Sequence, residues 1–225
     1  MIMNKKWTMA ALSLAAGIAA INTASANTVS GTIWETTTGI AQNAIPANVP
    51  PSMTPGTAGV TFTAPSDPLS FNPTDTTSIY TLGAWLTSAG ATGTYFGGAA
   101  STDTLDATIM NVTGTVSVTT GEMFTIQHDD GVTLDIGGVT VINDPGPTSA
   151  VETTETYTGP SGNQAFQLVY GECCGAPASL VVDLPLSTPG TPELSTWGMM
   201  AVGFGAIGFL AYRRGRPAKA LALSA

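Results

Sequence analysis

Positive charge is missing from most of this chain of 225 residues. Its six lysine and arginine residues lie near the two ends, and none occurs between Asn27 and Pro192. Fourteen of the fifteen acidic residues fall inside that window, because only Glu193 lies beyond it. Nucleic acids bind through lysine and arginine, so we expect no nucleic-acid partner. Divalent cations prefer carboxylate and carbonyl oxygens, although an acidic surface that only keeps the protein soluble is the alternative.

Residue types that usually carry catalysis are also scarce. Histidine occurs once, and the sequence has no Gly-x-Ser-x-Gly elbow and no phosphate-binding loop. Between residues 27 and 192 no basic side chain could stabilise developing negative charge. We therefore predict a protein without catalytic activity. A secreted glycoside hydrolase is the less favoured alternative, because its pair of acids is defined by separation in space and not by a motif.

Cysteine is limited to one adjacent pair, Cys173 and Cys174. In an oxidising compartment their only partner within the chain is each other. Adjacent Cα atoms lie about 3.8 Å apart, below the usual disulfide range of roughly 4.4 to 6.8 Å, so a vicinal disulfide would be strained. The pair predicts a vicinal disulfide, two free thiols or a disulfide-linked dimer, in that order.

Long apolar runs occur only near the two ends of the chain. At the N-terminal end Lys5 and Lys6 precede an apolar segment over residues 9–21, and Ala24-Ser25-Ala26 follows. These are the charged, apolar and small-residue parts of a secretory signal peptide. The pattern predicts a signal peptide over residues 1–26, with cleavage between Ala26 and Asn27.

The second apolar run covers residues 197–212 and contains no charged side chain. It is shorter than the roughly 20 residues that comfortably span a bilayer. Arg213, Arg214 and Arg216 follow it directly. Under the positive-inside rule these arginines and the tail 217–225 stay in the cytoplasm. Residues 27–192 are therefore expected on the opposite side of the membrane.

The segment 188–216 resembles the PEP-CTERM sorting tail. The resemblance rests on the tripeptide Pro192-Glu193-Leu194, with leucine where the family has a second proline, and on Ser195-Thr196-Trp197, the apolar helix and the arginine cluster. It implies cleavage by an exosortase near the tripeptide, a transient membrane stage, and a mature protein that is periplasmic, at the cell surface or extracellular. The family further implies an exopolysaccharide or biofilm setting. An ordinary single-pass anchor is the alternative.

The composition of residues 27–187, rich in threonine, valine, glycine and proline, predicts one all-β domain. We expect an antiparallel β-sandwich, because several strands carry apolar residues of one parity. The other expected features are an irregular arm over 41–55, a helix over 78–89, a bulge at Gly114 and a two-residue turn at Gly137-Gly138. Strands are expected at 29–34, 59–63, 110–118, 124–126, 132–136, 151–157, 165–170 and 179–184.

Residues 115–184 resemble the protective-antigen-type module, a β-sandwich found in bacterial toxins, glycosidases and adhesins. The match is carried by strand, Asp129-Asp130-Gly131, strand, turn and strand in this order. In the adhesin branch the Asp-Asp pair binds calcium, which in turn holds sugar hydroxyls. The resemblance therefore implies calcium at Asp129 and Asp130, with extracellular polysaccharide as a partner.

The sequence departs from the family pattern at one calcium ligand, and the aspartate pair has an alternative role. Glu172 stands in the loop where the related lectins have an asparagine ligand, and we assign it as the third calcium ligand. Asp129 and Asp130 could instead accept hydrogen bonds from backbone N–H groups and cap the turn. His128 shares the parity of the neighbouring apolar residues, which predicts a buried, hydrogen-bonded structural histidine in preference to a metal ligand.

Overall fold

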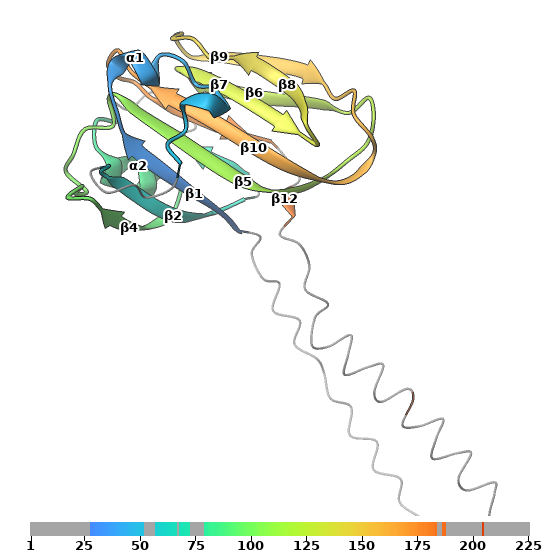
Figure 1. The fold of residues 1–225 in the computed structure, drawn as a ribbon, viewed down its shortest axis with the longest axis horizontal. Helices are drawn as coiled ribbons and strands as arrows, with labels where there is room; N and C mark the ends of the chain where they lie inside the picture. The colour runs from blue at the N-terminus through green and yellow to red at the C-terminus, as the bar shows by residue number, and fades with distance from the viewer. Residues whose placement is uncertain are drawn as a thin grey trace, which may run out of the picture.

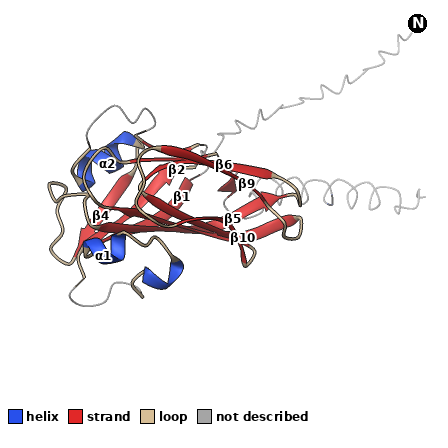
Figure 2. Ribbon diagram, turned by 90° about the horizontal axis from the view of Figure 1, so that it is seen from above, coloured by secondary structure: helices blue, strands red, loops and turns tan. Residues whose placement is uncertain are grey.

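The structure is a computed structural model that describes residues 28–51, 57–66, 68–72, 79–183, 186–187 and 204. In these ranges the chain forms two antiparallel sheets packed face to face, with a few short helices at their margins (Figures 1 and 2). The all-β sandwich that the composition predicts is confirmed. Threonine and valine favour strands, and these strands bury one face against the opposite sheet.

Within the described residues the larger sheet has eight strands, and the smaller one has four. The order in the larger sheet is β4 (Thr92–Phe96), β2 (Gly59–Pro65), β1 (Thr28–Glu35), β5 (Thr108–Val118), β10 (Gly162–Glu172), β7 (Gly131–Ile136) and β8 (Val139–Asp144), with β12 (Leu186–Ser187) paired to β5. The order in the smaller sheet is β3 (Leu69–Phe71), β11 (Ser179–Val182), β6 (Met123–Asp129) and β9 (Val151–Thr156). The sequence pattern did not predict β3 and β4.

A column of aromatic rings runs through the core between the sheets. Phe71 stacks on Trp85 with ring centres 4.8 Å apart, and Trp85 stacks on Tyr170 at 5.5 Å. Phe62 meets the edge of Phe71 at 5.8 Å. Such pairs add about 0.5 to 1.5 kcal/mol beyond the area they bury. The column therefore links β2, β3 and α2 (Leu82–Ser88) to β10, whose end carries the candidate site.

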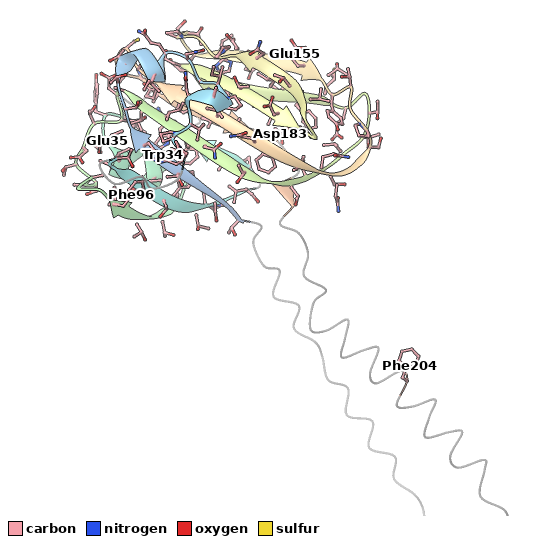
Figure 3. The ribbon with its side chains drawn as sticks, viewed as in Figure 1. Trp34, Glu35, Phe96, Glu155, Asp183 and Phe204 are labelled. Atoms are coloured by element: carbon pink, nitrogen blue, oxygen red, sulfur yellow. The ribbon has the colours of Figure 1, made fainter. Side chains whose placement is uncertain are left out.

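The one helix predicted within the domain is shorter than the sequence pattern suggests. The helix expected over 78–89 is α2, and Thr81 caps it by accepting a 3.2 Å hydrogen bond from the N–H of Ala84. Helix α1 (Thr38–Ala41) leads into the irregular arm, and the arm contains the 3-10 helix η1 (Pro46–Asn48). A small cluster of buried side chains lies on the outer face of the larger sheet, with Trp34 and Phe96 side by side (Figure 3); its members are Trp34, Ala44, Ile109 and Val169, with Val49 and Phe96 packed against them. Ala44 and Val49 belong to the arm, which therefore lies across the sheet as expected.

The two-residue turn is confirmed, whereas the bulge is not where the sequence suggested. Gly137 and Gly138 join β7 to β8 with φ angles of 58° and 80°, which glycine adopts without strain. Strand β5 pairs without interruption through Gly114 along β10, so the prediction of a bulge there is wrong. The irregularity instead lies between Leu134 and Asp135, where β7 shifts its register against β8.

The chain changes sheets at the Asp-Asp-Gly motif. Strand β6 pairs with β9 and β11, whereas β7 pairs with β8 and β10, so the two strands do not form a hairpin with each other. Gly131 allows a close approach between two backbone segments. A Cβ atom there would lie 2.1 Å from the carbonyl oxygen of Pro145.

Several predictions fall outside the described residues. These are the signal peptide 1–26 with its cleavage site, the sorting segment from Pro192 onward and the arginine cluster. Phe204, inside the expected membrane helix, is described as helical and exposed. Within the residues that the structure describes, no helix is both long enough and apolar enough to cross a membrane.

Candidate cation-binding site

The predicted site residues meet at one end of the sandwich. Asp129 is the last residue of β6, and Glu172 is the last residue of β10. Asp130 connects β6 in the smaller sheet to β7 in the larger sheet, and this connection is called the crossing below. The register places Gly171 opposite Gly131 and therefore brings the end of β10 beside the crossing. The exposed fractions of Asp129, Asp130 and Glu172 are only 7%, 5% and 2%. Three carboxyl groups are thus buried in one region of a domain that has no lysine or arginine between residues 27 and 192.

Tyr170 organises this region, and the sequence analysis did not identify it. Its hydroxyl oxygen lies within hydrogen-bond distance of the Asp129 carbonyl oxygen and of Glu172 Oε2. Burial raises the pKa of Glu172 to about 10, and the nearby charges of Asp130 and Asp129 act in the same direction, against the lowering effect of the Tyr170 hydrogen bond. The Tyr170 hydroxyl is the donor toward both oxygens, which compete for its one proton.

This arrangement shows what calcium would have to displace at Glu172, whose assignment as a calcium ligand stays a prediction. In the absence of a cation its carboxyl group is neutral at pH 7 and is engaged with Tyr170, whereas a calcium ligand must supply an ionised or carbonyl oxygen. Tyr170 could have been found from the sequence, because it lies two residues before Glu172 and alternate residues of a strand share a face.

Asp130 makes the contacts of a turn cap. Its Oδ1 accepts a 3.1 Å hydrogen bond from the N–H of Thr148, and its Oδ2 accepts one of 2.9 Å from the N–H of Cys173. The peptide bond between Asp129 and Asp130 is cis. These contacts fit the turn-cap alternative, but each carboxylate oxygen can accept a second bond, so a cation could still bind.

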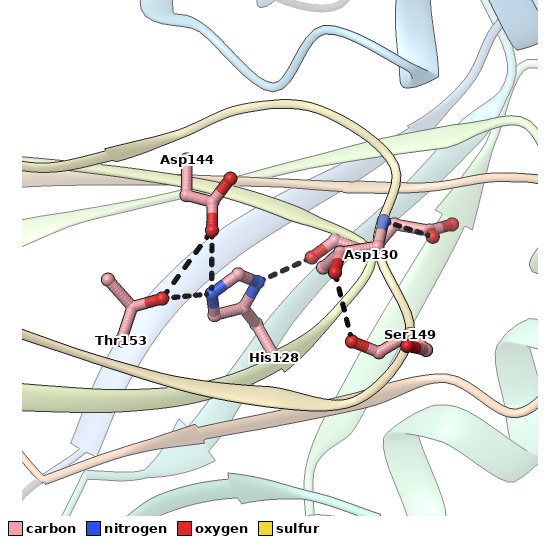
Figure 4. A network of polar contacts seen from close by, with 6 residues as sticks. His128, Asp130, Asp144, Ser149 and Thr153 are labelled. Carbon is pink, nitrogen blue, oxygen red and sulfur yellow. Dashed lines mark hydrogen bonds and ion pairs between the residues drawn. The ribbon is translucent and has the colours of Figure 1, made fainter.

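His128 is a structural histidine, as its parity predicts, and is fully buried. Its Nδ1 lies 2.6 Å from the carbonyl oxygen of Asp130, so Nδ1 carries the proton and donates (Figure 4). In the neutral ring, Nε2 then accepts from the Thr153 hydroxyl at 2.9 Å. Asp144 Oδ2 lies 3.6 Å from the same nitrogen. The ring thus holds the backbone of the crossing in place.

The two cysteines lie directly after β10. Cys173 and Cys174 are free cysteines in this structure, and the choice between a vicinal disulfide, two thiols and a linked dimer stays a prediction. The short Cα separation of neighbours disfavours the bond. Cys173 is buried and Cys174 is exposed. Burial raises the pKa of the Cys173 thiol, and Cys174 and Asp130 add to the effect, so this sulfur is protonated at neutral pH.

The closest set of metal-ligating atoms differs from the predicted set. Among the described residues, Asp130, Cys173 and Cys174 form the group of acidic, histidine or cysteine side chains whose ligand atoms all lie within 4.8 Å of one another. Asp129 and Glu172 do not belong to that group. The calcium ligand set therefore stays a prediction. Its members, Asp129, Asp130 and Glu172, lie in one region but do not form a group whose ligand atoms are all within 4.8 Å of one another.

A second candidate site is an open groove of about 480 Å³ on the outer face of the larger sheet. Strands β4, β2, β1 and β5 supply hydroxyl side chains, among them Ser30, Thr32, Thr61, Thr63, Thr94 and Thr113. None of the side chains that line the groove is charged. The sequence analysis missed this face, although threonine at alternate positions of two strands (61 and 63, 92 and 94) is a signal for a polar sheet face.

Comparisons with known proteins return distant likenesses in structure. No family model matches the sequence, and no curated protein does. The PA14 sugar-binding domain from an RTX adhesin has a TM-score of 0.48 and 18% identity, covering 70% of this chain and 88% of its own. The PA14 domain of the antifreeze protein MpAFP has a TM-score of 0.48 and 20% identity over 73% and 93%. An anti-sigma factor domain-containing protein has a TM-score of 0.31 and 24% identity over 36% and 32%.

Proposed function

We propose that this chain is an exported, non-catalytic binding module that holds calcium at Asp129 and Asp130. The observation that carries the proposal is the burial of three carboxyl groups at one end of a domain whose residues 27–192 include no lysine or arginine. Buried carboxylates are normally paired or bound to a metal. The available donors, carboxylate and carbonyl oxygens, are those that calcium prefers.

The position of the site suits a tethered protein. The first and last strands of the domain meet at one end of the larger sheet. Strand β1 begins there at Thr28, and β12 ends there at Ser187, which pairs with Thr115 of β5 at the level of Thr28. Glu35 and Glu172 lie at the other end of the same strands, both opposite Thr108. Seven residues of strand separate the two ends, about 23 Å at roughly 3.3 Å per residue. A chain held near its termini would present the carboxylates outward.

Export itself is part of the proposal. The charged, apolar and small-residue pattern of 1–26 supports a signal peptide, and the tail 188–216 supports transient membrane retention followed by exosortase cleavage. Absence of catalysis is supported by His128, because Thr153 and Asp144 both lie at its Nε2 while Nδ1 binds a backbone carbonyl. A catalytic triad needs its nucleophile and its carboxylate on different ring nitrogens.

Melting of the full chain with calcium or magnesium tests the proposal. Calcium at about a hundredfold above its dissociation constant stabilises the folded chain by about 2.7 kcal/mol and raises the melting temperature. Magnesium controls for diffuse relief of charge repulsion, because it demands tighter octahedral geometry. Asp129→Asn and Asp130→Asn should abolish the calcium-specific rise, while Glu155→Gln, an exposed acid on β9, should keep it. If calcium and magnesium raise the melting temperature equally, and both Asn variants keep this rise, Asp129 and Asp130 act only as a turn cap.

A second candidate function is binding of a neutral polysaccharide in the outer groove. Hydroxyl groups both donate and accept hydrogen bonds, which suits the hydroxyls of a sugar chain. Asn111 Oδ1 already accepts from Gln167 Nε2 at 2.8 Å, and Thr61 donates to the Thr94 carbonyl at 3.3 Å. The hydroxyls of Thr32 and Thr113 have no such bond to any described residue, so they can bind a ligand.

Retention on an immobilised neutral glucan separates the two sites. If the groove binds the glucan, a chelator should not reduce retention, whereas Thr32→Val and Thr113→Val should reduce it. Thr156→Val on the exposed strand β9 is the matched control and should be retained normally. Loss of retention with chelator, together with unchanged binding by both groove variants, would assign the sugar to the calcium site. Lack of retention under both conditions would contradict both carbohydrate hypotheses.

A further inference from the structure

The cysteine pair adds a donor chemistry that calcium does not use. The ligand atoms of Asp130, Cys173 and Cys174 lie within 4.8 Å of one another. We propose that these three side chains form a site for one thiophilic divalent ion of the zinc class. The proposal does not depend on the calcium function, although the two sites share Asp130.

The backbone explains why two adjacent cysteines can face one ion. Consecutive side chains of a strand point to opposite faces, so neighbouring cysteines in β10 would diverge. The strand ends at Glu172, however, and Cys174 has a φ of 71°, in the left-handed region. This turn brings both sulfurs to the same side of the chain as the Asp130 carboxylate. The exposed Cys174 leaves a route for an ion from solvent, while Cys173 is almost fully buried.

The donor set selects the kind of ion. Thiolate ligands favour zinc and other thiophilic ions, whereas calcium and magnesium take oxygen. Two sulfurs and one carboxylate oxygen make three protein ligands, and tetrahedral zinc then keeps its fourth position for water or a bound ligand. Binding breaks two S–H bonds, forms two metal–sulfur bonds and releases two protons to solvent. The site charge is unchanged by this exchange, because two protons leave as one divalent ion enters.

Neighbouring contacts hold the ligands in position. The side-chain amide of Gln42, at the C-terminal end of α1, donates to Cys174 Sγ at 3.4 Å. The N–H of Cys173 donates to Asp130 Oδ2, and His128 holds the Asp130 carbonyl oxygen at 2.6 Å. Outer contacts of this kind orient metal ligands and typically change metal affinity about 10- to 100-fold when removed.

Cadmium titration tests the site directly. The full chain would be purified in mild detergent, reduced, shown to carry two titratable thiols and freed of reductant without oxygen. Cadmium should then produce an ultraviolet thiolate-to-metal charge-transfer band that saturates at one ion per chain, with release of two protons. Zinc should displace cadmium, and a large excess of calcium should not remove the band.

Variants decide whether the three side chains act together. Cys174→Ser should remove most of the band without disturbing folding, because Cys174 is exposed. Asp130→Asn should weaken cadmium binding by at least about tenfold, in line with the loss of a metal-site contact. Asp129→Asn, the adjacent acid outside the group, is the matched control and should bind cadmium normally while losing the calcium response.

Failure of this site and failure of the calcium site are distinguishable. A reduced chain that shows no charge-transfer band, or a band that Asp130→Asn leaves at full affinity, would overturn the cysteine site. Neither result decides the calcium proposal, which is tested by the melting temperatures of Asp129→Asn and Asp130→Asn with calcium and magnesium. Cys173→Ser gives a further check where its melting temperature shows a folded protein, because retention of the complete band in that variant would also overturn the proposal.

Discussion

The backbone N–H of Cys173 donates a 2.9 Å hydrogen bond to the carboxylate of Asp130 and so joins the end of β10 to the crossing between the sheets. The other oxygen of Asp130 accepts from Thr148, in the connection that leads to β9. One buried side chain therefore holds three segments that are distant in the sequence. A residue in this position can be a structural cap and a metal ligand at once, which is why neighbouring Asp129 serves as the discriminating variant.

Glu172 should make the protein less stable as the pH rises. Its folded-state pKa is about 10, above the model-peptide value of 4.5, so the folded chain keeps a proton that the unfolded chain releases. The stability contributed by this proton is complete below about pH 4.5 and is lost progressively up to about pH 10. In chelator, Glu172→Gln should flatten this decline and raise the urea midpoint at pH 8. Glu155→Gln on the exposed β9 is the control, and an unaltered decline in Glu172→Gln would contradict the assignment.

Gly131→Ala should strongly destabilise the fold. The added Cβ would lie 2.1 Å from the Pro145 carbonyl oxygen, and the backbone cannot move aside as a flexible side chain could. We expect a loss of about 2 kcal/mol or more in the free energy of unfolding, measured in urea. Gly146→Ala is the matched control, because nothing lies within 4 Å of the Cβ that it would add. Equal midpoints for the two variants would refute the close-approach explanation.

Trp85→Ala should remove the centre of the aromatic column. Trp85 is fully buried between Phe71 and Tyr170, and truncation of a buried tryptophan costs about 3 to 5 kcal/mol. Because Trp85 positions the ring of Tyr170, the variant should also weaken the calcium-specific rise in melting temperature. Tyr80→Ala, with a side chain that is 57% exposed, should change stability by no more than about 0.5 kcal/mol. A small effect of Trp85→Ala would show that the column is not central to the core.

Mass spectrometry of the protein from its native cell surface tests the proposed processing. The mature N-terminus should be Asn27, and all residues beyond the Pro192 region should be absent, because the signal peptidase and the exosortase each remove one apolar segment. Recovery of intact chains that still contain Arg213 to Ala225 would reduce the tail to an ordinary anchor. An N-terminus at Met1 would contradict the signal peptide.

Local pattern was sufficient for many elements of this fold, although not for β3 and β4. Alternating valines in 110–118 predicted a strand with one buried face, and the pair Gly137-Gly138 predicted a turn that requires two positive φ angles. The apolar spacing of Ile79, Leu82 and Leu86 predicted the helix, although its start was placed too early, because Thr81 and not residue 77 or 78 is the N-cap. These signals are local, because they depend on the periodicity of one segment and on the allowed φ of single residues.

The sequence alone determined the class of the protein, an acidic all-β domain, because composition and charge do not depend on how segments meet. Tertiary structure decided the chemistry of the site. Only the connection from β6 to β7 places Asp130 beside Cys173 and Cys174. Only burial, with two aspartates nearby, raises the pKa of Glu172 to about 10 beside Tyr170. Distances between remote residues and the loss of solvent around a carboxyl group exist only after the sheets have packed.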